Sequence, residues 1–203
     1  MDERRALESL SLAQNELAEH RPDLIGQALA AELALMQELG CSSSKQKQIG
    51  RRLPDCGVAV TVLPATDLFL MGRDRELHVP RGVAPVHRLL DQGVTCALAN
   101  NNVLNPFTPF GNCSLFHMAN LYANIAQLGS PRDLQACFAM ITTLPARLMN
   151  VADYGIAVGH PADLVVLDSR DPAWAVAELA APLFGVKRGR HSFTCAAAAL
   201  HYP

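Results

Sequence analysis

The stretch that most constrains the fold of this 203-residue chain runs from Leu144 to Asp168. Pro145 stands in the first turn of a short predicted helix, where its missing N–H is not needed, and this helix should end near Asn150. Two glycines then flank a short extended piece, and Pro161 prevents any helical continuation. The run from Leu164 to Leu167 is apolar, β-branched and of strand length. The stretch therefore predicts a helix, two chain reversals and a buried strand.

Upstream of this junction, strand-like and helix-like segments alternate. Wholly apolar strands are typical of a parallel sheet that is covered on both faces, so the alternation favours an α/β fold. Downstream, residues 183–194 resemble two short strands around a turn. The expected strands are Val58 to Leu63 and Val94 to Ala99, and the expected helices are Ala84 to Gln92, Ser114 to Leu128 and one that begins at Ser130-Pro131.

Composition excludes several classes of protein. An apolar fraction of 50% with 18% charged residues is that of a globular interior, and a net charge of −2 with dispersed charges predicts neither a nucleic-acid partner nor a membrane partner. No apolar run approaches the ~20 residues that a spanning helix needs, and the first residues lead into no signal-peptide core, so a cytoplasmic location is expected.

The six cysteines are scattered without a Cys-x-x-Cys pair. We expect them to be small buried hydrophobic residues in a reducing compartment. The spacing also excludes the zinc deaminases that combine His-x-Glu with Pro-Cys-x-x-Cys.

The order of glycines, Pro-Ala-Asp and a Val-Val strand between Leu144 and Asp168 resembles the closing segment of the amidohydrolase superfamily. Further matches are closest to its cytosine deaminases: Gly57 to Pro64 resembles the penultimate barrel strand, Leu70 to Arg73 resembles the loop that follows, and Asn100 to Gly111 resembles the loop after the last strand. The resemblance implies an incomplete (β/α)₈ TIM-barrel-like unit followed by a small β-layer.

This resemblance covers residues 57–195 and predicts three parts: a helical segment at 1–56, the carboxy-terminal part of a barrel at 57–160, and the strands and tail of a small β-domain at 161–203. In the first part, helices are expected at 5–18, at 23–39 and near Lys45. They stand where further strand–helix units would be expected, which indicates a truncated gene product or a rearranged paralogue. Because a partial barrel exposes strand edges, the amino-terminal helices or a second chain, including a second copy, should cover them.

The resemblance also places the site. In such barrels the site lies at the carboxyl ends of the strands. The family's metal-binding and proton-transferring aspartate corresponds to Asn101, its ring-contacting neighbour to Asn102, and its stacking aromatic residue to Phe107. Since an amide cannot accept and return a proton near neutral pH, the general acid–base role should be absent at Asn101.

The family binds Fe or Zn through histidines and acidic residues on earlier strands, and we find no counterpart of these ligands. The seven histidines are expected to be ordinary surface or core residues, so no metal site and no cofactor is predicted for this chain alone.

Two functions stay open. One is a cytosine-deaminase-like enzyme that hydrolyses a C–N bond of a small cyclic amidine or amide, with the missing ligands supplied by a second polypeptide. The other is a non-catalytic remnant that binds a small ring compound or an interaction partner. Asn101 discriminates between them, because it counts against activity even in a barrel completed by the second polypeptide.

Overall fold

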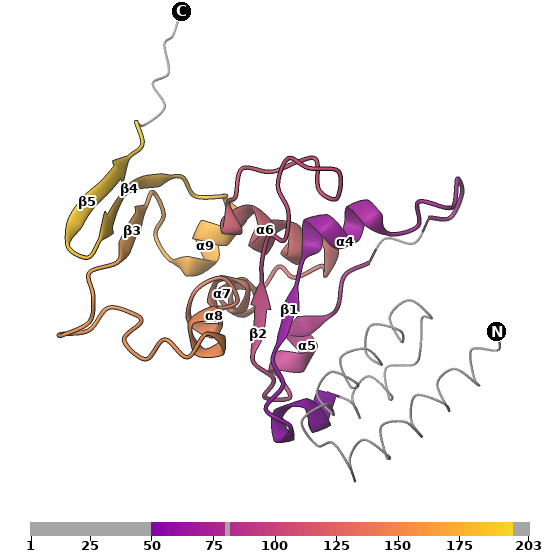
Figure 1. Cartoon of the computed structure of the whole chain (residues 1–203), viewed down its shortest axis with the longest axis horizontal. Helices are drawn as coiled ribbons and strands as arrows, with labels where there is room; N and C mark the ends of the chain where they lie inside the picture. The colour runs from indigo at the N-terminus through magenta and orange to yellow at the C-terminus, as the bar shows by residue number, and fades with distance from the viewer. Residues whose placement is uncertain (1–49, 80–81, 197–203) are drawn as a thin grey trace, which may run out of the picture. The chain divides into compact units, whose positions relative to one another are not determined.

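The computed structural model of the chain describes residues 50–79 and 82–196, and the first two expected helices lie outside this part. The described residues fall into two compact units, one comprising residues up to Val62 and 67–97, the other Leu63–Thr66 and the residues from Leu98 onward. The fold is mixed α/β (Figure 1). Within the described part, we find no helix with the length and apolar character that crossing a membrane requires, and the cytoplasmic location stays a prediction.

The first unit contains most of a two-stranded sheet made of β1 (Val60–Val62) and β2 (Cys96–Leu98). The Val60 N–H donates to the Thr95 carbonyl across 2.9 Å, and both arrows point to the same end in Figure 1, so the pair is parallel. The two expected strands are therefore neighbours, as predicted, but each is shorter than the apolar run that contains it. Helix α5 (Val86–Leu90) connects to β2 and buries Val86 and Leu89.

Helix α4 (Pro64–Leu70) was not predicted. It begins with a proline, which suits a first helical turn because the first N–H groups of a helix have no intrahelical partner. Its first three residues belong to the second unit.

The second unit is built around three helices that pack on one another: α6 (Leu115–Ile125), α7 (Pro131–Ala139) and α9 (Pro172–Ala177). Side-chain caps at Ser114 and Ser130 begin α6 and α7, which confirms the predicted helix starts. A shorter helix, α8 (Thr143–Leu148), ends two residues before the expected Asn150. The core of this unit includes Met118, Ala119, Tyr122, Cys137, Met140 and Val176.

The sequence analysis also missed α9, although its start carries a clear signal. The Asp171 carboxylate accepts hydrogen bonds from the N–H groups of Ala173 and Trp174, and Pro172 occupies the first turn. The side chain of Asn120 in α6 donates to the Val176 carbonyl across 2.9 Å and ties the end of α9 to the helical core.

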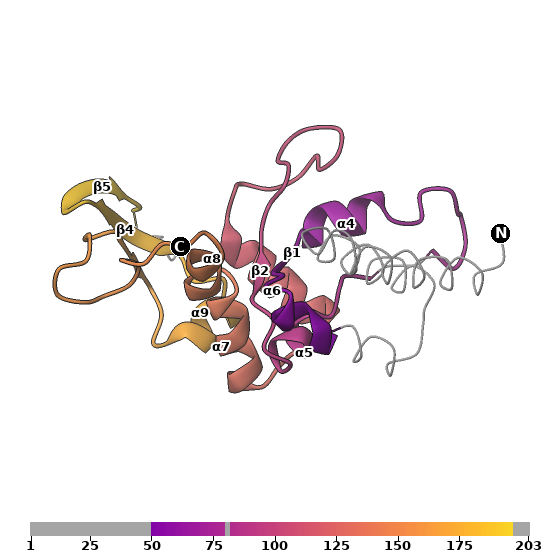
Figure 2. The ribbon, with the colours of Figure 1, turned by 60° about the horizontal axis from the view of Figure 1, so that its bottom comes forward.

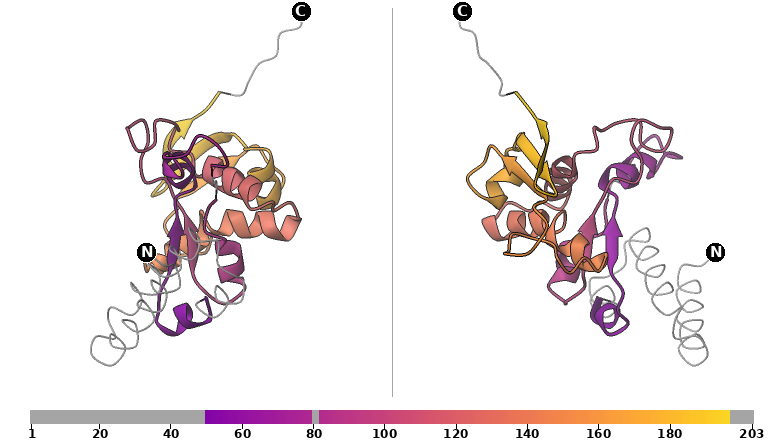
Figure 3. Two further views of the ribbon diagram at one scale, coloured as in Figure 1. Left: turned by 90° about the vertical axis from the view of Figure 1, so that its right-hand side faces the viewer. Right: turned by 60° about the vertical axis from the view of Figure 1, so that its left-hand side comes forward.

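The remaining strands form a separate antiparallel sheet in the order β3 (Leu164–Leu167), β4 (Pro182–Lys187), β5 (Arg190–Thr194), visible in Figure 3. Leu164 pairs with Val186, and Phe184 pairs with Thr194. The predicted pairing of a small β-layer is thus confirmed. The prediction that its first strand is buried is wrong: Val165 is 56% exposed, because β3 is an edge strand of a small sheet and not a central strand.

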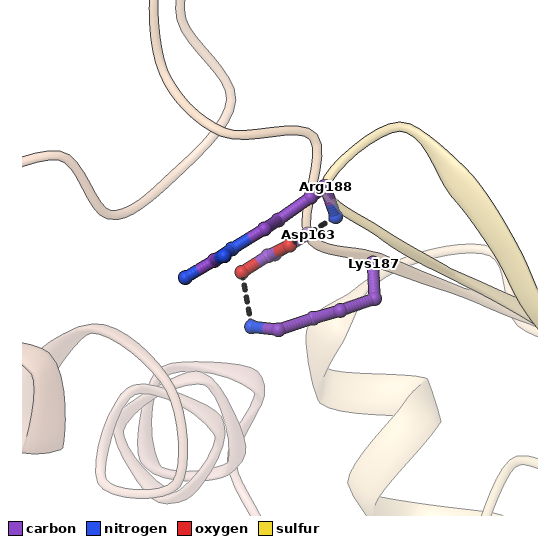
Figure 4. Close-up of polar contacts among 3 residues, drawn as sticks. All are labelled: Asp163, Lys187 and Arg188. Carbon is purple, nitrogen blue, oxygen red and sulfur yellow. Dashed lines mark hydrogen bonds and ion pairs between the residues drawn. The ribbon is translucent and has the colours of Figure 1, made fainter.

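Asp163, just before β3, holds the β4–β5 turn (Figure 4). Its carboxylate accepts from the Arg188 N–H at 2.7 Å and from the Lys187 ammonium. Arg188 and Gly189 both have positive φ, as a two-residue turn between twisted strands requires. The hydrogen bond from Lys187, followed by that from the Arg188 backbone, lowers the pKa of Asp163 below its ordinary value.

Acidification should therefore loosen this turn. Because the pKa of Asp163 is lower in the folded state, its contribution is complete above the ordinary carboxyl pKa and is lost as pH falls through the folded value. We expect the protection of the Arg188 amide against exchange, relative to its intrinsic rate at each pH, to fall at acid pH, and its signal to shift in an NMR titration. Asp163→Asn should remove most of this pH response, whereas Asp168→Asn should retain it. A titration unchanged by Asp163→Asn would contradict the assignment.

Candidate functional site

The loop of residues 99–114 connects β2 to α6 and extends away from the helices of the second unit (Figure 2). It carries all three predicted site residues. Asn101 is exposed, Asn102 is half-buried, and the ring of Phe107 is 58% exposed. Their proposed roles stay predictions.

Asn105, which the sequence analysis did not single out, organises the loop. Its Oδ1 accepts from the N–H groups of Phe107 and Thr108, both at 3.0 Å, and its Nδ2 donates to Oδ1 of Asn102 at 2.7 Å. The Asn105 and Thr108 backbones also exchange two hydrogen bonds of 3.2 Å around Pro106. The dipeptide Asn-Pro is a signal for such a turn, since asparagine side chains bond the backbone two residues ahead.

The loop contains backbone strain next to this turn. Leu104 has a φ of +55°, a left-handed conformation that is uncommon outside glycine, asparagine and aspartate. The hydrogen bond between Asn102 and Asn105 spans Leu104. The asparagine pair therefore helps to hold the strained residue in place.

A buried pair of hydroxyl groups anchors the loop. Thr108 is only 1% exposed, and its Oγ1 lies 2.7 Å from Oγ1 of Thr66, which is 7% exposed and stands in the first turn of α4. Both residues belong to the second unit. The segments that follow β1 and β2 are thus joined at the same end of the sheet, where the sequence analysis placed the site.

Removing one hydroxyl of this pair should destabilise the protein more than removing both. Thr108→Val leaves the Thr66 hydroxyl buried without its partner, which costs about 1–3 kcal/mol. The double variant Thr66→Val/Thr108→Val buries two apolar side chains of similar shape and should recover much of the loss. The free energies of unfolding of Thr66→Val, Thr108→Val and the double variant, measured with urea, check this. Additive losses would show that the two hydroxyl groups do not interact.

The described residues provide no metal centre. No group of three or more His, Cys, Asp or Glu side chains that could hold a metal ion occurs in residues 50–79 and 82–196. The resemblance predicts a metal-binding carboxylate at the position of Asn101, where this chain has an amide. The donor set in this part of the chain does not fit the Fe or Zn that the resemblance implies.

The two buried cysteines of the described part offer no activated thiol. Burial raises the pKa of both Cys96 and Cys137 to about 12, so these thiols stay protonated at neutral pH. The expectation that the cysteines are buried is confirmed for these two. It is wrong for Cys56, Cys113 and Cys195, which are exposed because they lie in turns or near a strand end. Cys41 lies outside the described residues.

Comparison with known proteins now identifies the fold family. A sequence model described as "Amidohydrolase family" matches residues 8–188, most of the chain. The chain belongs to this family. The match begins well before residue 57, so the sequence analysis was wrong to start the resemblance there; the helical periodicity of the first segment had hidden it.

Among curated relatives, N-isopropylammelide isopropyl amidohydrolase of Pseudomonas sp. (strain ADP) is 38% identical over 107 residues, 52% of this chain and 27% of that protein. Pterin deaminase of Rhizobium rhizogenes is 34% identical over 56% of this chain and 26% of its own length. Imidazolonepropionase of Ectopseudomonas mendocina is 31% identical over 92% of this chain and 40% of its own length. The chain therefore spans less than half of these relatives.

A solved structure, 5-methylcytosine deaminase from Klebsiella pneumoniae liganded with 5-fluorocytosine, matches 97% of this chain and 54% of its own chain. The TM-score is 0.78 and the sequence identity is 20%. At this identity the likeness shows the fold alone. It agrees with the family assignment and adds no statement about substrate.

Proposed function

We propose that this chain is the carboxy-terminal part of an incomplete amidohydrolase barrel that binds a small nitrogen-containing ring and that, by itself, does not hydrolyse it. The observation that carries the proposal is the loop after β2, in which Asn101, Asn102 and the exposed Phe107 follow the strand end while a buried threonine pair anchors the loop. The names of the relatives support a ring substrate with a C–N bond to be hydrolysed, since deaminases of pterin and deoxyadenosine are among them.

The lack of activity is proposed from the chemistry of the same loop. Transfer of a proton to and from the substrate requires a group that accepts and releases a proton near the working pH. The Asn101 amide does not do this. The exposed Asn101 therefore supports ring binding more than it supports catalysis.

Hydrolysis would need groups from outside the described residues, and we propose a second polypeptide of different sequence as their source. This partner would bring the ligands for Fe or Zn and an acid–base group. The described residues leave room for this alternative because they contain no group of three or more His, Cys, Asp or Glu side chains that could hold a metal ion.

A second candidate function is protein interaction without a ring ligand. The segment Met149–Val158 favours it, because Met149, Ile156 and Val158 are strongly exposed apolar side chains in one short stretch. Contiguous exposed apolar residues are typical of interaction sites.

Metal content, mass in solution and ring binding would test these proposals together. We expect the purified full chain to contain no tightly bound Fe or Zn, to release no ammonia from cytosine, pterin or 5′-deoxyadenosine, and to bind at least one of these rings in ligand-observed NMR. About one tightly bound metal ion per chain together with ammonia release would overturn the non-catalytic proposal. A metal-free monomer that binds no ring would leave protein interaction as the function.

A further inference from the structure

The hydrogen bonds of the loop determine the orientation of two side-chain amides. The oxygen and nitrogen of an asparagine amide differ only in hydrogen bonding, so neighbours decide which way the group faces. At Asn105 the neighbours are unambiguous: the backbone N–H groups of Phe107 and Thr108 can only donate, so the atom they contact must be Oδ1.

The orientation of the Asn105 amide also determines the orientation of the Asn102 amide. With its oxygen turned to the backbone, Asn105 presents Nδ2 to its neighbour, and the contact of 2.7 Å requires an acceptor on the other side. Asn102 therefore uses its Oδ1 internally. Its Nδ2, a donor, is left for a ligand, and no hydrogen bond of this nitrogen is found among the described residues.

We propose that Asn105 is a positioning residue that holds the Asn102 amide with its nitrogen toward the ligand, so that the loop selects small aromatic rings that offer a hydrogen-bond acceptor. The aromatic face for such a ring is Phe107, whose own N–H is held by Asn105 and whose side chain is exposed. A carboxylate at position 102 would select the opposite kind of ring, one that offers an N–H donor. The inference rests on the proposed ring-binding function and specifies its ligand class.

Two substitutions at different positions should invert this selection. Asn102→Asp keeps an inner oxygen that accepts from Asn105 and places a second acceptor toward the ligand. Asn105→Asp keeps the bonds to the two backbone N–H groups, but its other oxygen needs a donor, so the unchanged Asn102 should turn its nitrogen inward and its oxygen outward. Asn112→Asp is the matched control, because it adds the same charge to the loop and keeps its bond to the Ser114 N–H.

The probes are pyridine, a neutral acceptor ring at alkaline pH, and pyrrole, a neutral donor ring. We expect the full chain and Asn112→Asp to bind pyridine about tenfold more tightly than pyrrole in ligand-observed NMR, and both other variants to prefer pyrrole. A merely structural role of Asn105 would weaken both rings equally. Equal affinities in the unsubstituted chain, or an unchanged preference in the two variants, would overturn the inference.

Hydrogen exchange of the side-chain amides separates this inference from the proposed function. In the unsubstituted chain the Asn105 amide protons should exchange more slowly than those of Asn102, and Asn105→Asp should protect Asn102. If neither ring binds, the ring-binding function and its ligand class fail. If the Asn102 amide is the protected one from the start, the proposed orientation fails even where rings bind.

Discussion

Asn101→Asp should raise the rate of ring deamination about 10²- to 10⁴-fold in a chimera that joins the amino-terminal part of a solved relative to this chain. The reason is the chemistry of the side chain. A carboxylate accepts a proton and returns it near neutral pH, whereas the Asn101 amide does neither. The amino-terminal part of the relative would supply what the described residues of this chain lack.

The chimera must be compared at equal metal content and equal ring affinity, so that the change in rate reports the proton transfer alone. Ammonia release at substrate saturation is the measurement. Asn112→Asp serves as the control, because it places the same charge elsewhere in the loop without losing the hydrogen bond to Ser114. No gain from Asn101→Asp in a metal-loaded, ring-binding chimera would mean that residue 101 is not the acid–base position.

Much of the local structure could be predicted from the sequence because its causes are local. The caps at Ser114 and Ser130 were recognisable because serine accepts a hydrogen bond from the first turn of a helix. The strand at Leu164–Leu167 was recognisable as a β-branched run between turn residues. The family followed from the order of such signals.

Burial and pairing were harder to predict because they depend on residues far away in the chain. An apolar run such as β3 does not reveal whether it is central or at an edge, so its exposure was missed. The contact between Thr66 and Thr108 joins residues 42 positions apart, and neither threonine is distinctive in its own sequence context. The role of Asn105 is not predictable from the sequence, because the Asn-Pro dipeptide indicates a turn but does not show which side chain the Asn105 amide nitrogen contacts.

Leu98→Ala should lower the free energy of unfolding by about 2–5 kcal/mol, the usual cost of emptying a well-packed leucine site. Leu98 ends β2, is only 2% exposed, and directly precedes the loop that carries the site. Its N–H donates to the carbonyl of Met140 across 2.9 Å, and the Met140 side chain is fully buried. A cavity at this position should therefore also increase amide exchange in the loop, because the loop begins at the next residue.

The matched control is Leu104→Ala, which removes the same atoms from a leucine within the loop. The Leu104 side chain is 74% exposed. Alanine keeps a Cβ, so the strain of the positive φ at this position is unchanged, and the expected effect is within about ±0.5 kcal/mol. Urea denaturation of both variants gives the comparison. If the two substitutions cost the same, burial of Leu98 does not hold the end of β2 in place. A large loss for Leu98→Ala alone, with faster exchange at Asn101 and Asn102, would show that the core beneath the strand end keeps the candidate site in position.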